Sequence, residues 1–153
     1  MSMSVTLQQY LEQQGIPYDL IPHRHTETSM NAASAAHVSA AKIAKPVILE
    51  DEKGYLMAVV PAHHHVRINA LNRILGRKVG LATEQELIPL FADCAEGAIP
   101  PVGQAYGIET VVDACLGECA DLYLEAGDHE DFIHLDSAAY DKLMAHAHHA
   151  KIS

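Results

Sequence analysis

The segment over residues 47–60 constrains the fold of this 153-residue chain more than any other. Residues 47–50 and 55–60 are two apolar runs, and the polar residues between them end in glycine. Two such runs joined by a short glycine-containing turn are typical of a β-hairpin. Because the runs are apolar almost throughout, the sheet that contains them should be covered on both faces. The chain is therefore predicted to combine helices with strands rather than to form an all-β domain.

Helical patterns and further apolar runs surround this hairpin. The clearest helix start is the capping box Thr83-Glu-Gln-Glu86, and Ser29 is the expected N-cap of an alanine-rich helix. We expect helices at about residues 5–14, 31–37, 68–75, 83–91 and 136–146, and further strands at about residues 18–21, 78–81, 110–112, 121–124 and 131–135.

No repeat, linker or low-complexity stretch divides the chain, and its length is that of one ordinary domain. Hydrophobic residues make up 49% of the sequence, which argues against disorder. We therefore expect a single α+β domain over residues 1–153, with a mixed, mostly antiparallel sheet flanked by helices. Its core should span about residues 5–145, and the histidine-rich tail at residues 146–153 should be solvated and frayed.

The features of membrane and secreted proteins are missing from the sequence. No run reaches the roughly 18 to 20 apolar residues that a membrane span needs, and the N-terminus has no basic-then-apolar signal pattern. Cys94, Cys115 and Cys119 form no CxxC pair, so reduced thiols are expected, and nothing nearby activates one as a nucleophile. We expect a soluble, cytoplasmic protein without membrane contact.

Eleven histidines raise the question of a metal site. The densest groups are residues 63–65 and 146–149, but neighbouring residues on a strand point to alternate faces and do not readily converge on one ion. We expect both groups to be solvated, with no metal and no cofactor. A histidine-rich metal-binding protein is the alternative. The P-loop, GxGxxG, GxSxG and HExxH signatures are also absent.

Lys45 stands at the start of an apolar strand, in the run IAKPVIL. A positive charge that enters a core needs a partner or a function. Either its stem lies along the strand end with the amine in water, or the amine is held at the rim of a pocket. In the second case it would bind a phosphate or carboxylate as a point charge.

The loop over residues 97–103, GAIPPVG, holds two glycines and two prolines in seven residues. Glycine allows close approach of the backbone to a ligand, and proline holds a loop still. The loop is either a rigid turn between elements or a set of backbone N–H groups that polarise a carbonyl and stabilise an oxyanion.

Four features occur in order along the chain: Ala44-Lys45, the GAIPP run at 97–101, Val112-Asp113, and a strand leading to Ala126-Gly127. In this order and spacing, over about residues 5–145, the chain resembles the YbaK/prolyl-tRNA-synthetase-associated (ProX-like) editing domain family. The resemblance implies a free-standing aminoacyl-tRNA deacylase. Such an enzyme hydrolyses the ester between a wrongly attached amino acid and the terminal adenosine of a tRNA, often the tRNA for proline.

The resemblance also implies the site. It places the family's lysine at Lys45, which would bind the terminal phosphate or ribose. The N–H groups of Gly97 and Ala98 would stabilise the oxyanion, and the substrate's 2′-hydroxyl would orient the attacking water. Family members often carry a small hydroxyl residue after the lysine, where this chain has Pro46, so the resemblance does not fix which amino acid is removed. The expected substrate-binding residues are Thr28, Ser29, Met30, Pro46, Ile99, Pro100, Pro101 and His134, the last of which is otherwise a core or surface histidine.

The expected partners are the acceptor end of a mischarged tRNA and an aminoacyl-tRNA synthetase. The net charge of −10 argues against non-specific coating of nucleic acid, but residues 42–78 contain seven basic and three acidic residues. We expect this segment to form one basic face that guides the tRNA end. The alternative function is a non-catalytic module that binds aminoacyl-tRNA or a synthetase.

Overall fold

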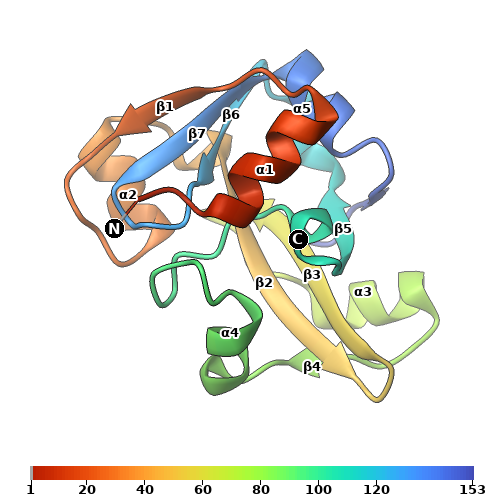
Figure 1. Ribbon diagram of the computed structural model, residues 1–153. Helices are drawn as coiled ribbons and strands as arrows, with labels where there is room; N and C mark the ends of the chain where they lie inside the picture. The colour runs from red at the N-terminus through yellow and green to blue at the C-terminus, as the bar shows by residue number, and fades with distance from the viewer. Residues whose placement is uncertain (1) are drawn as a thin grey trace.

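The computed structural model describes residues 2–153 and consists of one twisted sheet with helices packed on it (Figure 1). The helices are α1 (Val5–Gln14), α2 (Ser29–Ala36), α3 (Ile68–Leu75), α4 (Glu84–Leu90) and α5 (Ser137–Leu143), with short 3-10 helices η1 (Ala40–Lys42), η2 (Gly103–Tyr106) and η3 (Ala114–Glu118). The strands are β1 (Asp19–Pro22), β2 (Ile43–Asp51), β3 (Gly54–Pro61), β4 (Gly80–Leu81), β5 (Glu109–Asp113), β6 (Asp121–Glu125), β7 (Asp131–Asp136) and β8 (His148–Ala150).

The predicted hairpin, β2–β3, lies at the centre of the sheet. The strand order is β1-β7-β6-β2-β3-β5-β8, and the short β4 pairs with the far end of β2. Four pairings are antiparallel. The pairings β2–β6, β3–β5 and β5–β8 are parallel. The expected α+β fold with a mixed, mostly antiparallel sheet is thus confirmed, although the antiparallel majority is small.

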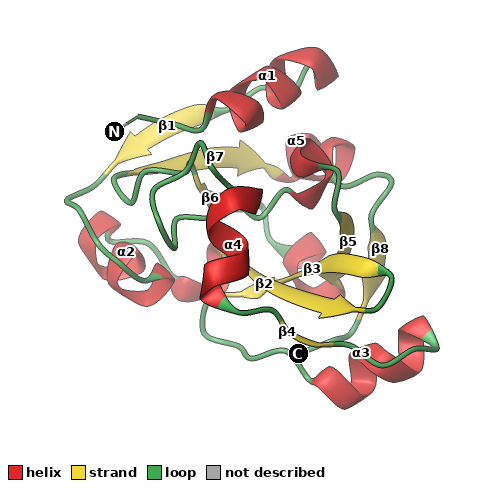
Figure 2. Ribbon diagram, turned by 60° about the horizontal axis from the view of Figure 1, so that its bottom comes forward, coloured by secondary structure: helices red, strands yellow, loops and turns green. Residues whose placement is uncertain are grey.

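Helices cover both faces of the sheet, as the apolar hairpin predicted (Figure 2). On one face, Leu7 and Leu11 of α1 and Tyr140 of α5 pack into the largest core cluster. On the other face, α3 packs through Leu71 and α2 through its buried alanines. The helices on each face therefore exclude water from that side of the central strands.

The strand β2 begins at Ile43, so Lys45 lies inside it rather than at its entry. On its outer side β2 pairs with β6 only at Ile43 and Ala44, and with β4 only at Leu49 and Glu50. Between these pairings the strand has no neighbouring strand on that side within the described chain. Pro46, which has no backbone N–H to donate, falls in this gap, where the sheet tolerates it.

Several expected boundaries differ from the structure. Thr28, not Ser29, is the N-cap of α2, because its hydroxyl accepts from Asn31 N and Ser29 is already the first helical residue. The strand expected from residue 78 begins only at Gly80, and the last helix ends at Leu143. The capping box at Thr83 and Glu86 forms as predicted.

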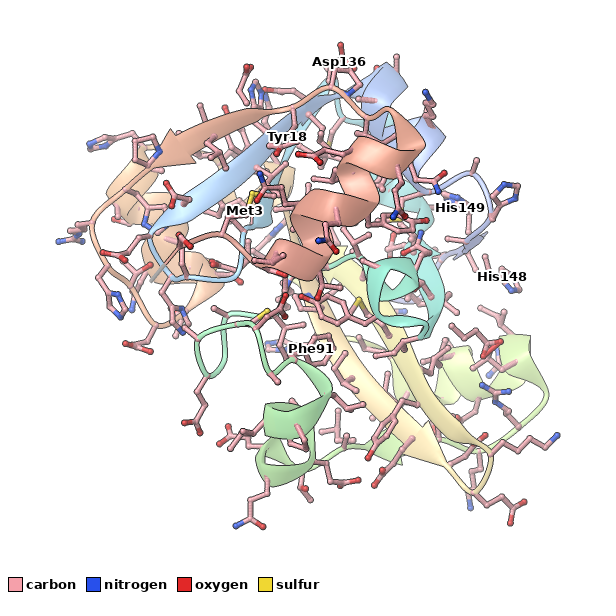
Figure 3. All side chains as sticks on the ribbon, viewed as in Figure 1. Met3, Tyr18, Phe91, Asp136, His148 and His149 are labelled. Carbon is pink, nitrogen blue, oxygen red and sulfur yellow. The ribbon has the colours of Figure 1, made fainter. Side chains whose placement is uncertain are left out.

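The C-terminal tail is not frayed, and that expectation was wrong. Residues 148–150 form β8, which pairs in parallel with β5, and Ile152 is fully buried against α3 and β3. Asp113, at the end of β5, is only 2% exposed, and its Oδ2 accepts from Ile152 N and Ser153 Oγ. His148 and His149 remain exposed on this outer strand (Figure 3). A buried carboxylate therefore fastens the tail to the sheet.

In the part of the chain that the structure describes, no helix combines the length and apolarity needed to cross a membrane.

Candidate functional site

A cavity of about 660 Å³ lies between α4 and the loop that follows it. Of the residues expected to form the site, Gly97 and Ile99 line it. Phe91 points inward from the end of α4 and packs edge-on against Tyr106, with ring centroids 4.7 Å apart (Figure 3). The cavity wall is lined by Glu27, Glu84, Leu87, Ile88, Pro89, Phe91, Ala92, Cys94, Ala95, Glu96, Gly97 and Ile99.

The Gly97 loop is fastened to the turn between β6 and β7. Ala95 N donates to Gly127 O at 2.8 Å, and Nε2 of His129 lies 2.7 Å from Glu96 O. Because a carbonyl oxygen only accepts, Nε2 of His129 carries the proton in this contact. The backbone of Gly97 is in the left-handed region (φ +80°), beside the His129 ring. The turn therefore sets the position of the loop.

Two backbone N–H groups of the loop are free to bind a ligand. Ala98 N already donates to Ala95 O at 2.9 Å, so the predicted use of Ala98 as an oxyanion donor requires that this bond be exchanged. Pro100 and Pro101 have no N–H. Within residues 2–153, Gly97 N and Ile99 N have no protein acceptor, and both residues line the cavity. These two donors suit an oxyanion at this wall.

Glu27 and His129 belong to the site although nothing in the sequence indicated them. Glu27 Oε1 lies 2.7 Å from His25 Nε2, and its Oε2 lies 3.5 Å from His129 Nε2. The hydrogen bond with His25 holds the pKa of Glu27 below its ordinary value. His129 has a positive φ of 62° and is 5% exposed. Pairing of β1 with β7 brings these residues together, and this pairing is not visible in a single local motif.

The first residue of β7, directly after the turn between β6 and β7, has a carboxyl group that titrates at about pH 6. The hydrogen bond with Asp128, together with burial, raises the pKa of Asp131 to about 6. Asp131 thus binds its proton more tightly in the folded protein than in the unfolded chain. Its contribution to stability is full below the ordinary pKa of 3.8 and is lost as the pH rises through about 6.

We expect Asp131→Asn to remove this loss of stability. The melting temperature of the unchanged protein should fall relative to that of the variant between about pH 4 and about pH 7. Thermal unfolding across this pH range, followed by circular dichroism, measures the difference. Asp141→Asn, at an exposed position on α5, is the matched control and should keep the original pH slope. Parallel pH profiles for Asp131→Asn and the unchanged protein would contradict the assignment.

Lys45 is half-buried on the face of β2 that α2 covers, and it is not part of the cavity lining. Its Nζ donates to Ala62 O at 3.1 Å. Burial lowers the pKa of its amine. Pro46 points to the opposite face, because successive strand residues alternate. Thr28, Ser29 and Met30 start α2, and Met30 is 50% exposed.

His134 lies apart from the large cavity, beside a smaller one of about 220 Å³ that Tyr18 and Asp136 also line. Its Nε2 is 2.8 Å from Asp121 Oδ2, and its ring stacks on Tyr123 with centroids 4.5 Å apart. The structure therefore places His134 in a surface network rather than beside Gly97.

Cys94 is the one cysteine in the cavity lining. Burial raises the pKa of its thiol to about 11, and its Sγ lies 3.2 Å from Tyr106 Oη. A thiol with this pKa is not ionised at neutral pH and is a poor nucleophile.

Part of the expected basic face is neutralised. Arg77 pairs with Asp51 at 3.0 Å and with Glu109 at 2.6 Å, and Lys42 pairs with Asp121 at 2.8 Å. Among the described residues, no group of three or more His, Cys, Asp or Glu side chains is arranged to hold a metal ion.

One protein-family model matches the chain. Residues 23–143, well over half of the chain, match the aminoacyl-tRNA editing domain. A comparison with curated protein sequences finds no significant match.

Solved structures show the same fold at low sequence identity. A candidate trans-editing enzyme for prolyl tRNA synthetase matches with a TM-score of 0.84 and 22% identity over 99% of both chains. Hypothetical protein APE2540 matches with a TM-score of 0.84 and 24% identity, over 96% of this chain and 98% of that one. A protein from Marinobacter aquaeolei VT8, described as acting in signal transduction, matches with a TM-score of 0.79 and 21% identity, over 99% of this chain and 31% of that one. The match over residues 23–143 shows that the chain belongs to the aminoacyl-tRNA editing domain family.

Proposed function

We propose that this protein is an aminoacyl-tRNA deacylase that acts in trans on mischarged tRNA. The observation that carries the proposal is the Gly97 loop of an editing-family member: Gly97 and Ile99 line a cavity, and their backbone N–H groups have no acceptor among the described residues. A synthetase cannot strongly reject an amino acid that differs by a methylene, so a second site must hydrolyse the product. We expect the enzyme in the cytoplasm, with the tRNA for proline or a similar tRNA as substrate.

The proposed reaction needs no nucleophilic side chain. Water adds to the ester carbonyl carbon, and the oxyanion so formed accepts from Gly97 N and Ile99 N. The bond from the carbonyl carbon to the ribose oxygen then breaks, and the proton of the water passes to that oxygen. The neighbouring 2′-hydroxyl of the substrate orients the water. The high pKa of Cys94 favours this route over a thioester intermediate.

We propose that Lys45 binds the phosphate or ribose of the terminal nucleotide. Phosphate suits the lysine rather than the cavity, because the charged residues of the cavity lining are all glutamates. The strand gap beside Lys45 and the anchored loop are both on the β6 side of β2. A tRNA end that enters at this gap would present its phosphate to Lys45 and its ester to Gly97.

The decisive experiment is deacylation of alanyl-, cysteinyl- and seryl-tRNA for proline by the purified protein. At least one ester should be lost much faster than it hydrolyses spontaneously, and Lys45→Ala should lower kcat/KM by up to about 100-fold, as the loss of a hydrogen bond to a charged group predicts. Lys142→Ala, at an exposed position on α5 outside residues 42–78, is the matched control and should keep full activity. Saturable tRNA binding without ester loss would instead support the non-catalytic module.

A further inference from the structure

The charged side chains that line the large cavity are all acidic. Its ionisable carboxylates come from Glu27, Glu84 and Glu96, and no lysine, arginine or histidine of the described chain lines it. The rest of its wall is apolar or backbone. A cavity of this kind repels phosphate and accepts a group that is uncharged or cationic. It therefore suits the amino-acid part of an aminoacyl ester rather than the nucleotide part.

Glu27 is the glutamate of the lining that contacts a residue anchoring the Gly97 loop, and its side chain is 70% exposed. His25 and His129 flank its two oxygens at 2.7 and 3.5 Å. The backbone next to it is also held, because Thr26 N donates to His129 O at 3.1 Å. His129 in turn holds Glu96 O at the start of the loop. One histidine thus connects the Glu27 carboxylate to the backbone donors of the site.

The substrate's own chemistry supplies a partner for this carboxylate. In an aminoacyl ester the α-ammonium group is one carbon away from the ester carbonyl. When the carbonyl oxygen accepts from Gly97 N and Ile99 N, the α-ammonium lies within the same cavity, where Glu27 is held. A charge-assisted hydrogen bond between the two would fix the ester for attack.

We propose that Glu27 is a specificity-determining residue that binds the α-ammonium of the aminoacyl group. This inference rests on the proposed deacylase function. The enzyme then selects esters that carry a free amine and discriminates against esters whose amine is absent. The pocket recognises the one feature that all mischarged amino acids share, while the apolar wall of α4 contacts the side chain.

The test compares an aminoacyl-tRNA with the matching α-hydroxyacyl-tRNA, in which a hydroxyl replaces the amine at nearly constant size. Each enzymatic rate is divided by the spontaneous hydrolysis rate of the same ester, because the amine alters the reactivity of the ester. The unchanged protein should prefer the free amine about 30-fold, as a hydrogen bond to a charged group predicts. Glu27→Gln should lower kcat/KM for the aminoacyl ester about 30-fold and leave the hydroxyacyl ester unaffected.

The control is Glu52→Gln, which removes the same charge from the exposed hairpin turn and should change neither rate. Equal losses on both esters in Glu27→Gln would show that Glu27 only supports the loop, and no loss on either would show that it does not contact the substrate. Both results overturn the inference while the deacylase function stands. Absence of any ester hydrolysis by the unchanged protein would instead overturn the proposed function itself.

Discussion

Gly97→Ala should slow ester hydrolysis by about 100-fold, as the loss of an oxyanion donor does in other enzymes. The backbone of Gly97 has a φ of +80°, where a residue with a Cβ is strained by about 1–2 kcal/mol. The alanine Cβ itself would meet His129 Cε1 at 3.7 Å, an ordinary contact, so the variant should still fold. Relief of the strain would turn the Gly97 and Ile99 N–H groups away from the cavity. Single-turnover kinetics would report this loss directly.

Gly107→Ala provides the control for this variant. Gly107 also has a positive φ, of +68°, and its Cβ would meet nothing within 4 Å. It should show a similar fall in melting temperature, of about 2–8 °C for this strain, with unchanged hydrolysis. Equal loss of activity in both variants would mean that Gly97 matters for stability alone.

Asp113→Ala should cause the largest loss of stability, about 3 kcal/mol or more. Burial acts to raise the pKa of Asp113, but hydrogen bonds from Ser153, Cys115 and Ile152 outweigh it and lower that pKa. Removal of the carboxylate leaves buried N–H groups without an acceptor and releases β8 and Ile152 from the core. The midpoint of urea unfolding gives the change in free energy of unfolding.

Asp113 is the N-cap of η3, and Asp136 is the N-cap of α5. Asp136→Ala is therefore the comparison for Asp113→Ala, because the Asp136 carboxylate accepts from Ala139 N of its own helix rather than from the C-terminal tail. Loss of such a cap costs about 1 kcal/mol. If the two variants lose the same stability, the carboxylate of Asp113 does not fasten the tail.

The elements that the sequence predicted well are those whose signals are local. The hairpin has continuous apolar strands and a glycine turn, and the capping box at Thr83 needs only residues three apart. The tail gave no such signal, since three residues in β8 and one buried isoleucine are too few to show a period. These residues are held in place by the pairing of β8 with β5, which lies more than thirty residues earlier in the sequence.

The same distinction applies to the site. The composition of the Gly97 loop alone marked it, and the loop does line the main cavity. Glu27 and His129 are about a hundred residues apart and meet only because β1 pairs with β7. His134 was expected either as a pocket residue or as a core or surface histidine, and its contacts with Asp121 and Tyr123 place it away from the loop. The variants of Lys45, Gly97 and Glu27 test which of these residues act in the reaction.

The fastening of the tail has a consequence for how the protein is made. Synthesis proceeds from the N-terminus, so β5 emerges from the ribosome long before its neighbour β8. Until then β5 presents an open edge that other chains are able to join, and Asp113 lacks the Ile152 and Ser153 donors that it has in the finished core. Residues 148–150 therefore cover the β5 edge, and a nascent chain halted before them leaves that edge open to aggregation.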